Sequence, residues 1–228
     1  MFSIIEVFYQ PGKLFESLRE RPSAWVFPLL VDILVLVASV AVLVNLVGIE
    51  SMMRQRLQNT NMSPEQMQTA LQRMNSPAAG YFTYASAALG GVVSIVAVAG
   101  LLMIFAMMAQ QKPKFGSMLS MVSLAFLPYR VIAGVMTTLV LIASPDRTSL
   151  DFTNLLATNI GAFVDKATTS KGLYSVLSSI DLLSFLAIGM LAYGFSKVTR
   201  ASFASGLAAV LTLWILLVIS RAAASSLF

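Results

Sequence analysis

Five long apolar runs constrain the fold of this chain more than any other feature. They cover about residues 27–49, 85–109, 119–142, 176–195 and 203–220. A helix needs about 20 residues to cross the hydrocarbon core of a bilayer, and each run is close to that length. Inside lipid, a single run can satisfy its backbone polar groups only by forming a helix. The runs therefore predict an all-α, polytopic membrane protein with five transmembrane helices.

The composition agrees with this class of protein and argues against others. Charged residues make up 11% of the 228 residues, against about 25% in soluble domains. The chain has no cysteine and no histidine, so the common zinc ligands and a thiol nucleophile are lacking. It contains neither a phosphate-binding glycine loop nor a nucleophile elbow, and no basic cluster with interleaved aromatics. We expect no metal, no cofactor, no nucleic acid and no enzymatic activity.

Lysine and arginine in the loops predict the orientation, because they are enriched on the cytoplasmic side of a membrane. With the N-terminus in the cytoplasm, residues 1–26, 110–118 and 196–202 face inward. The two sides carry equal numbers of these residues, but the inward segments are shorter and their charge is denser. No cleavable signal peptide precedes the first run. We therefore predict a cytoplasmic N-terminus.

Three segments outside the runs have amphipathic patterns, at 12–20, 64–74 and 151–164. The tetrapeptide "SPEQ" at 63–66 offers an N-cap serine, a proline at the first helical position and a capping-box glutamine. Amphipathic helices of this kind lie flat on the membrane or cover the ends of the spans. We expect interfacial helices in all three segments.

Small residues recur at four-residue spacing in the second run, in the pairs Ala87–Gly91 and Gly90–Ser94. Such pairs let two helix backbones approach closely. They predict tight helix packing, either within the bundle or between two copies of the chain.

Three ionisable residues fall inside apolar runs: Asp32, Arg130 and Asp181. Charged groups are costly in lipid, so they are candidates for a functional site or for an ion pair that fixes the packing of the helices. Pro128 lies two residues before Arg130, and we predict that it kinks the third span because it removes a helical hydrogen bond.

Two carboxylates compete for Arg130. Counted at 1.5 Å per residue, each lies about 10 Å from Arg130 along the membrane normal. Side chains lean toward the N-terminus of their helix, which favours Asp32, whereas the neighbouring serines at 178, 179 and 184 favour Asp181. We predict Asp181 as the partner, with Asp32 as the alternative.

Several phrases resemble the Yip family, whose eukaryotic members are Ypt/Rab-interacting membrane proteins. "YQPGKLFESLRERPSAWVFPLL" is similar to the entry segment of the family, and "KPKFGSMLSMVSLAFLPY" to the basic loop and proline-containing third span. "ATNIGAFV" and "LYSVLSSIDLLSFLAIGMLAYGFSKV" resemble the end of the second long loop and the fourth span of bacterial members. The resemblance implies five spans, a cytosolic N-terminus and a role in membrane organisation or trafficking.

Two departures limit what the resemblance implies. Bacterial relatives commonly have an aromatic residue, often tryptophan, a few residues after the aspartate of the fourth span, where this chain reads "DLLSFL" at 181–186. The chain also lacks the long acidic region and the "DLYGP"-type motif of eukaryotic members, so Rab binding is not implied. We expect a bacterial-type member in the inner cell membrane, with one membrane domain over residues 1–228.

Two functions are compatible with these features. The first is a non-enzymatic protein that organises the membrane through lipids, a second copy of itself or a partner membrane protein. The alternative is a small transporter, channel or lipid-moving protein that uses Asp32, Arg130 and Asp181 as a polar core.

Overall fold

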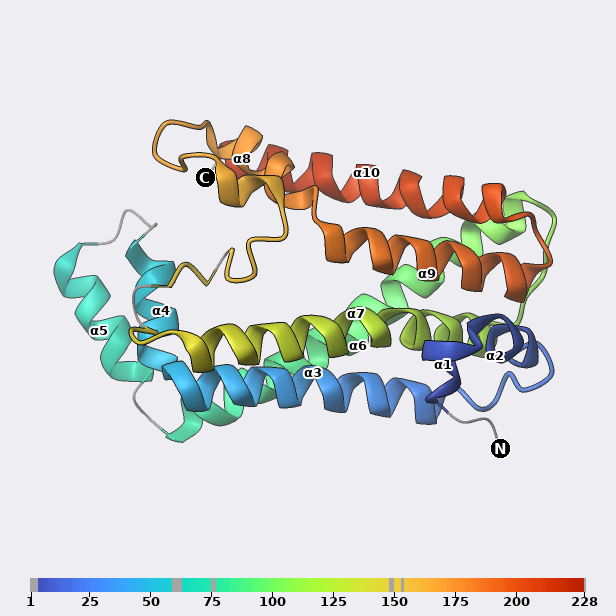
Figure 1. Ribbon diagram of the computed structural model, residues 1–228, viewed down its shortest axis with the longest axis horizontal. Helices are drawn as coiled ribbons and strands as arrows, with labels where there is room; N and C mark the ends of the chain where they lie inside the picture. The colour runs from blue at the N-terminus through green and yellow to red at the C-terminus, as the bar shows by residue number, and fades with distance from the viewer. Residues whose placement is uncertain (1–3, 59–62, 75–76, 148–149, 153, 228) are drawn as a thin grey trace.

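The described residues form five long helices, which run side by side through the molecule (Figure 1). The computed structural model describes residues 4–58, 63–74, 77–147, 150–152 and 154–227. The long helices are α3 (Val26–Val47), α6 (Pro77–Met108), α7 (Phe115–Ala143), α9 (Leu182–Thr199) and α10 (Phe203–Leu227). All five are long and apolar enough to cross a membrane. The prediction of an all-α protein with five transmembrane helices is confirmed.

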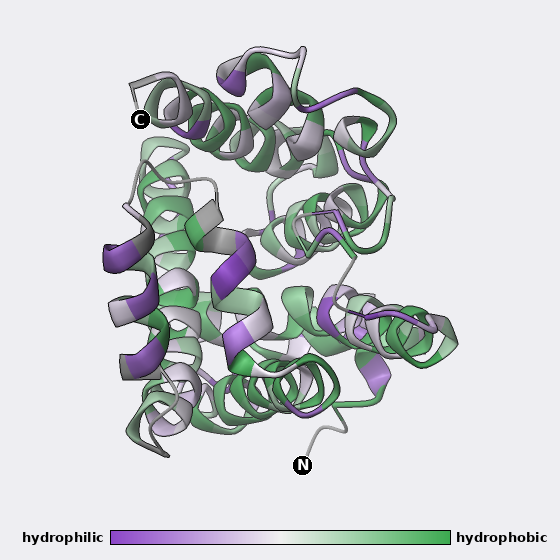
Figure 2. Ribbon diagram, turned by 90° about the vertical axis from the view of Figure 1, so that its left-hand side faces the viewer, coloured by the Kyte–Doolittle hydropathy of each residue, from purple (hydrophilic) through white to green (hydrophobic). Residues whose placement is uncertain are grey.

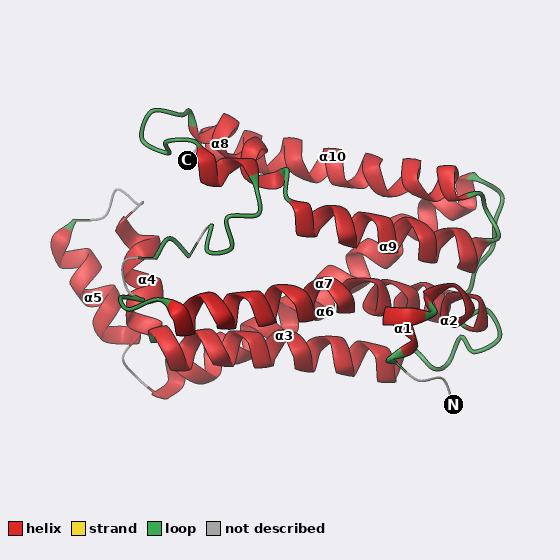
Figure 3. Ribbon diagram, in the orientation of Figure 1, coloured by secondary structure: helices red, strands yellow, loops and turns green. Residues whose placement is uncertain are grey.

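The ends of the bundle differ in what covers them. At the N-terminal end lie α1 (Glu6–Tyr9), α2 (Pro11–Ser17) and the short loops that follow α6 and α9. At the opposite end, which we call the α5 end, lie α4 (Ile49–Gln58), α5 (Pro64–Met74) and α8 (Lys171–Ser179). Figure 2 views the bundle from the α5 end, with hydrophilic residues on the short helices and apolar helices behind them. Figure 3 shows loops gathered at the two ends.

The helix α7 is central to the packing, because it contacts α3, α6 and α9. Its first half is buried around nearly the whole circumference, from Ser117 to Ala125. The helices α9 and α10 pack on each other, and α8 packs on α10. The core of the molecule therefore lies around the N-terminal half of α7.

The residues at 4–22, which we call the N-terminal segment, cover the N-terminal end of the spans. Leu14, Phe15 and Leu18 are completely buried against the bundle. The Ser117 hydroxyl of α7 donates a 2.7 Å hydrogen bond to the Leu18 carbonyl. The helix predicted over 12–20 is thus present as α2, and it packs into the end of the bundle.

A glycine at the start of α7 lets the N-terminal segment pack closely against that helix. A methyl group at Gly116 would lie 1.9 Å from the Pro22 carbonyl oxygen, so only glycine leaves room for the backbone of the N-terminal segment. The start of α7 is therefore level with Pro22, four residues before α3 begins.

The predicted helix at 64–74 is confirmed as α5, and its capping box forms. The Ser63 backbone N–H donates to Gln66 Oε1 at 3.0 Å, and the Gln66 N–H donates to Ser63 Oγ at 3.3 Å. The preceding helix α4 was not expected from the sequence. Its Gln55 side chain forms hydrogen bonds with the backbone of Leu150 and Phe152. These bonds tie α4 to the loop between α7 and α8, which we call the second long loop.

The predicted helix over 151–164 is wrong. Among the described residues of this segment, only a short 3-10 turn, η1 (Ile160–Phe163), is helical. Asn159 donates to the Asn154 side chain at 2.8 Å and accepts from the Ala162 N–H at 3.1 Å. Asparagine side chains that bond nearby groups compete with the helical backbone, which explains the irregular conformation.

The predicted fourth span at 176–195 is also wrong at its start. Residues 171–179 form the separate helix α8, and the chain breaks at Ile180 and Asp181 before α9 begins at Leu182. The backbone of Asp181 is extended, and the Leu182 N–H bonds the Thr158 carbonyl at 3.1 Å. The second span begins eight residues before the predicted start of 85, at Pro77.

Candidate functional site

A buried ion pair joins two of the transmembrane helices. Asp32 of α3 is fully buried, and its Oδ1 lies 3.3 Å from Nε of Arg130 on α7. The Arg130 side chain is 12% exposed. Breaking such a pair leaves an uncompensated buried charge, so each partner holds the other in place.

The surroundings of Arg130 come from two helices. The guanidinium carbon lies 5.7 Å from the centroid of the Phe126 ring, one turn earlier on α7. On α6, a methyl group at Gly91 would lie 3.7 Å from Nη1 of Arg130 and 2.7 Å from side-chain atoms of both Ile33 and Leu36. Gly91 therefore lets α6 pack against α3 beside the ion pair, as predicted for one of the two small-residue pairs.

The other small-residue pair has a different environment. Gly90 is exposed and has no neighbouring atom within 4 Å of the position of an added methyl group, and Ser94 is exposed as well. This pair is not used in packing within the described part of the chain. Packing against a second copy stays a prediction.

The predicted pairing of Arg130 with Asp181 is wrong, and the alternative, Asp32, is the partner in the structure. The contact of Gly116 with Pro22 sets α7 beside α3 with their starts offset. From this contact, a rise of 1.5 Å per residue places Arg130 only about 6 Å farther along than Asp32. The side chain of Arg130 leans toward the N-terminus of α7 and closes that gap.

Asp181 has a different role, at the start of α9. Its Oδ2 accepts hydrogen bonds from the Ser184 backbone N–H and from the Ser184 hydroxyl, both at 3.1 Å. This is helix N-capping, which satisfies an amide that has no partner in the first turn. The sequence carried this signal, because an aspartate directly precedes an apolar helical run.

Pro128 lies inside α7, and the helix continues without a break to Ala143. Pro128 is buried. The predicted kink at this residue stays a prediction.

Several buried polar atoms near these residues have no hydrogen-bond partner among the residues that the structure describes: Asp32 Oδ1, Asp32 Oδ2, Arg130 Nη1, Ser178 Oγ and Asp181 Oδ1. The first three belong to the ion pair of Asp32 and Arg130, whose contact of 3.3 Å lacks the geometry of a hydrogen bond. Polar atoms that lack a hydrogen-bond partner inside a span could bind a proton or a polar solute. Within the described residues, no group of three acidic, histidine or cysteine side chains could hold a metal ion.

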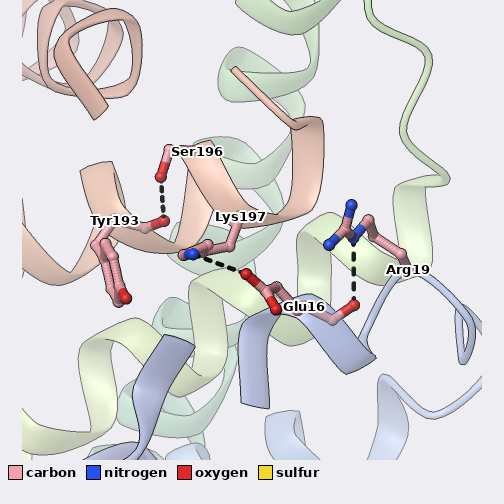
Figure 4. A network of polar contacts seen from close by, with 5 residues as sticks. All are labelled: Glu16, Arg19, Tyr193, Ser196 and Lys197. Carbon is pink, nitrogen blue, oxygen red and sulfur yellow. Dashed lines mark hydrogen bonds and ion pairs between the residues drawn. The ribbon is translucent and has the colours of Figure 1, made fainter. Parts of the chain in front are cut away.

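A second ion pair, which the sequence reasoning missed, fastens the N-terminal segment to α9 (Figure 4). Lys197 Nζ donates to Glu16 Oε1 at 2.7 Å and lies 5.5 Å from the centroid of the Tyr193 ring. Phe15 packs edge-on against the same ring, at 6.4 Å between centroids. The hydrogen bond from Lys197, followed by its charge, holds the pKa of Glu16 below its ordinary value.

This shift predicts how pH affects the attachment. A carboxyl whose pKa is lower in the folded state stabilises that state above its unfolded pKa, here 4.5, and stops doing so as the pH falls through its folded pKa. We expect the melting temperature of the native chain in detergent to exceed that of Glu16→Gln slightly at about pH 7. The difference should shrink below pH 4.5 and then vanish. Glu20→Gln is the control, and a difference for Glu16→Gln that persists at the lowest pH would contradict the assignment.

Taken together, these features define an α-helical integral membrane protein with five spans, a buried ion pair and an N-terminal segment docked into the bundle. The family model described as Yip1 domain matches residues 5–224. The chain therefore belongs to the Yip family of membrane proteins. Comparisons with curated proteins and with solved structures gave no match.

Proposed function

We propose that this protein organises its membrane without catalysing a reaction, by inserting part of the N-terminal segment into one leaflet. One observation carries the proposal. Ile5, Phe8 and Tyr9 are 66%, 49% and 61% exposed, although they lie outside the five spans. Val7 between them is buried against the bundle. The segment is thus anchored on one side and presents apolar and aromatic groups on the other.

Such groups favour the region between headgroups and acyl chains, where aromatic side chains of membrane proteins are enriched. Apolar segments inserted at that depth in only one leaflet make binding sensitive to membrane curvature. The loops with the denser positive charge are at the same end, so we place the insertion in the cytoplasmic leaflet. Lipids are then the direct partners of this end of the molecule.

The test uses the full chain reconstituted into lipid vesicles, with vesicle diameters measured by electron cryomicroscopy. We expect the native protein to reduce the mean diameter, and Phe8→Glu to lose about half of that effect or more, because a charge opposes insertion. Gln10→Glu is the matched control, since it adds the same charge at an exposed residue of the segment without removing apolar surface. Equal diameters with and without protein would refute the proposal.

The alternative function, transport of a solute or lipid, is favoured by the unsatisfied polar atoms of Asp32 and Arg130 inside the bundle. Flux measured in the same vesicles separates the two functions. A flux that Asp32→Asn abolishes and Phe8→Glu leaves unchanged would replace our proposal, provided that Asp32→Asn still folds.

A further inference from the structure

We propose that a basic cavity at the N-terminal end of the bundle binds a phosphate group. The cavity has a volume of about 310 Å³, which is near the lower limit for sites of small ligands. Its wall is built by three parts of the chain that are far apart in sequence. Four of the residues lining it are cationic: Arg19, Lys112, Lys114 and Arg200.

The charge in this cavity is not balanced from within. None of the described residues that line it is acidic. The two acids near Arg19 along the chain, Glu16 and Glu20, do not line the cavity, and the carboxylate of Glu16 pairs with Lys197. Figure 4 shows that carboxylate turned toward Lys197, while Arg19 Nε donates to the Glu16 backbone carbonyl at 3.3 Å. The described residues that line the cavity therefore carry a net positive charge, which attracts an anion.

The backbone adds to this field. The helix α7 begins at Phe115, directly after the lining residue Lys114, and its first turn holds no acidic residue. The N-terminus of a long helix carries partial positive charge and free amide groups, which suit phosphate oxygens. Arg200 follows the end of α9 in a left-handed conformation, with φ of 62°, which turns the chain at the edge of the cavity. Four cations and a helix N-terminus converging on one cavity fit a phosphate better than a carboxylate, because phosphate offers more charge and more acceptor oxygens.

The position of the cavity favours a lipid as the source of the phosphate. It lies where α6 and α9 end and where α7 and α10 begin, the level at which headgroups meet a spanning bundle. Met108, Phe115 and Phe203 are each within three residues of a lining residue and are 76%, 41% and 49% exposed. Acyl chains can lie against these apolar groups while the headgroup enters the cavity. A phosphomonoester should bind more tightly than a phosphodiester, because it carries up to two negative charges.

The proposal is tested on the full chain in nanodiscs of neutral phosphatidylcholine. Binding of phosphatidic acid, phosphatidylglycerol and, separately, inorganic phosphate is measured by native mass spectrometry and by thermal shift. We expect phosphatidic acid to bind most tightly of the three. The double variant Lys112→Gln with Lys114→Gln should weaken the binding of phosphatidic acid about tenfold or more, because it removes two cations that attract the anionic headgroup. If inorganic phosphate binds equally well and competes, the site takes free phosphate.

The matched control is Lys13→Gln with Arg21→Gln, which removes two exposed positive charges from the same end of the bundle outside the cavity. An equal loss in both double variants would overturn the site, because it would show attraction by general surface charge. Arg200→Asn is the second variant, since asparagine tolerates the left-handed conformation; it should weaken binding while melting as the native chain does. Binding unchanged in Arg200→Asn and in the lysine variant would also overturn the proposal. Vesicle shape plays no part in this test, so its outcome is independent of the proposed function.

Discussion

Replacing Asp32 with alanine should lower the free energy of unfolding by about 3–5 kcal/mol, because Arg130 is then buried without a partner. This is one of the two largest effects that we expect. Asp32 is fully buried, and Arg130 Nε is its ion-pair partner at 3.3 Å. The measurement is denaturant unfolding in mild detergent, followed by the tryptophan fluorescence of the chain.

Two further variants separate the ion pair from other causes of instability. Asp181→Ala removes the carboxylate that caps α9 and should cost only about 0.5–2 kcal/mol. The double variant Asp32→Asn with Arg130→Met should recover most of the stability, since replacing both partners of a buried pair with neutral side chains is often tolerated. Equal losses for Asp32→Ala and Asp181→Ala, with no recovery in the double variant, would show that the pair does not hold α3 to α7.

The second large effect is expected for Phe15→Ala, which should also lower the free energy of unfolding by about 3–5 kcal/mol. Phe15 is completely buried and packs against Tyr193, so its removal leaves a cavity where the N-terminal segment meets α9. Phe8→Ala is the control, because Phe8 is 49% exposed on the same segment. Unfolding in detergent and the rate of trypsin cleavage after Lys13 and Arg19 both report on the docking. A loss no greater for Phe15→Ala than for Phe8→Ala would contradict it.

The sequence predicts the spans well, because bilayer thickness imposes a length of apolar helix that can be read directly from a run of residues. The sequence does not predict the boundary of a span where the residues beyond the end of the helix are also apolar. Ile180 and Asp181 interrupt such a run, and the break comes from capping and from a bond to the second long loop. An N-cap aspartate was the available signal for this break.

The candidate site was predicted only in part, for a different reason. The three charged residues were identified from their unfavourable position in lipid. Their pairing depends on how far α7 is shifted along α3, and the contact of Gly116 with Pro22 that sets this shift has no local pattern. The pair of Glu16 and Lys197 spans 181 residues of sequence. The sequence analysis places both residues in segments between the apolar runs, at 1–26 and 196–202, where charged residues are ordinary.

The docking of the N-terminal segment also has a consequence for the order of assembly during translation. Residues 4–22 leave the ribosome before any of the five spans, yet Phe15 and Glu16 contact Tyr193 and Lys197 near the end of the fourth span. The binding surface for the segment does not exist until most of the chain has been synthesised and inserted. The N-terminal segment must therefore stay undocked while the spans that follow it are inserted, and the fourth span completes the surface onto which it packs.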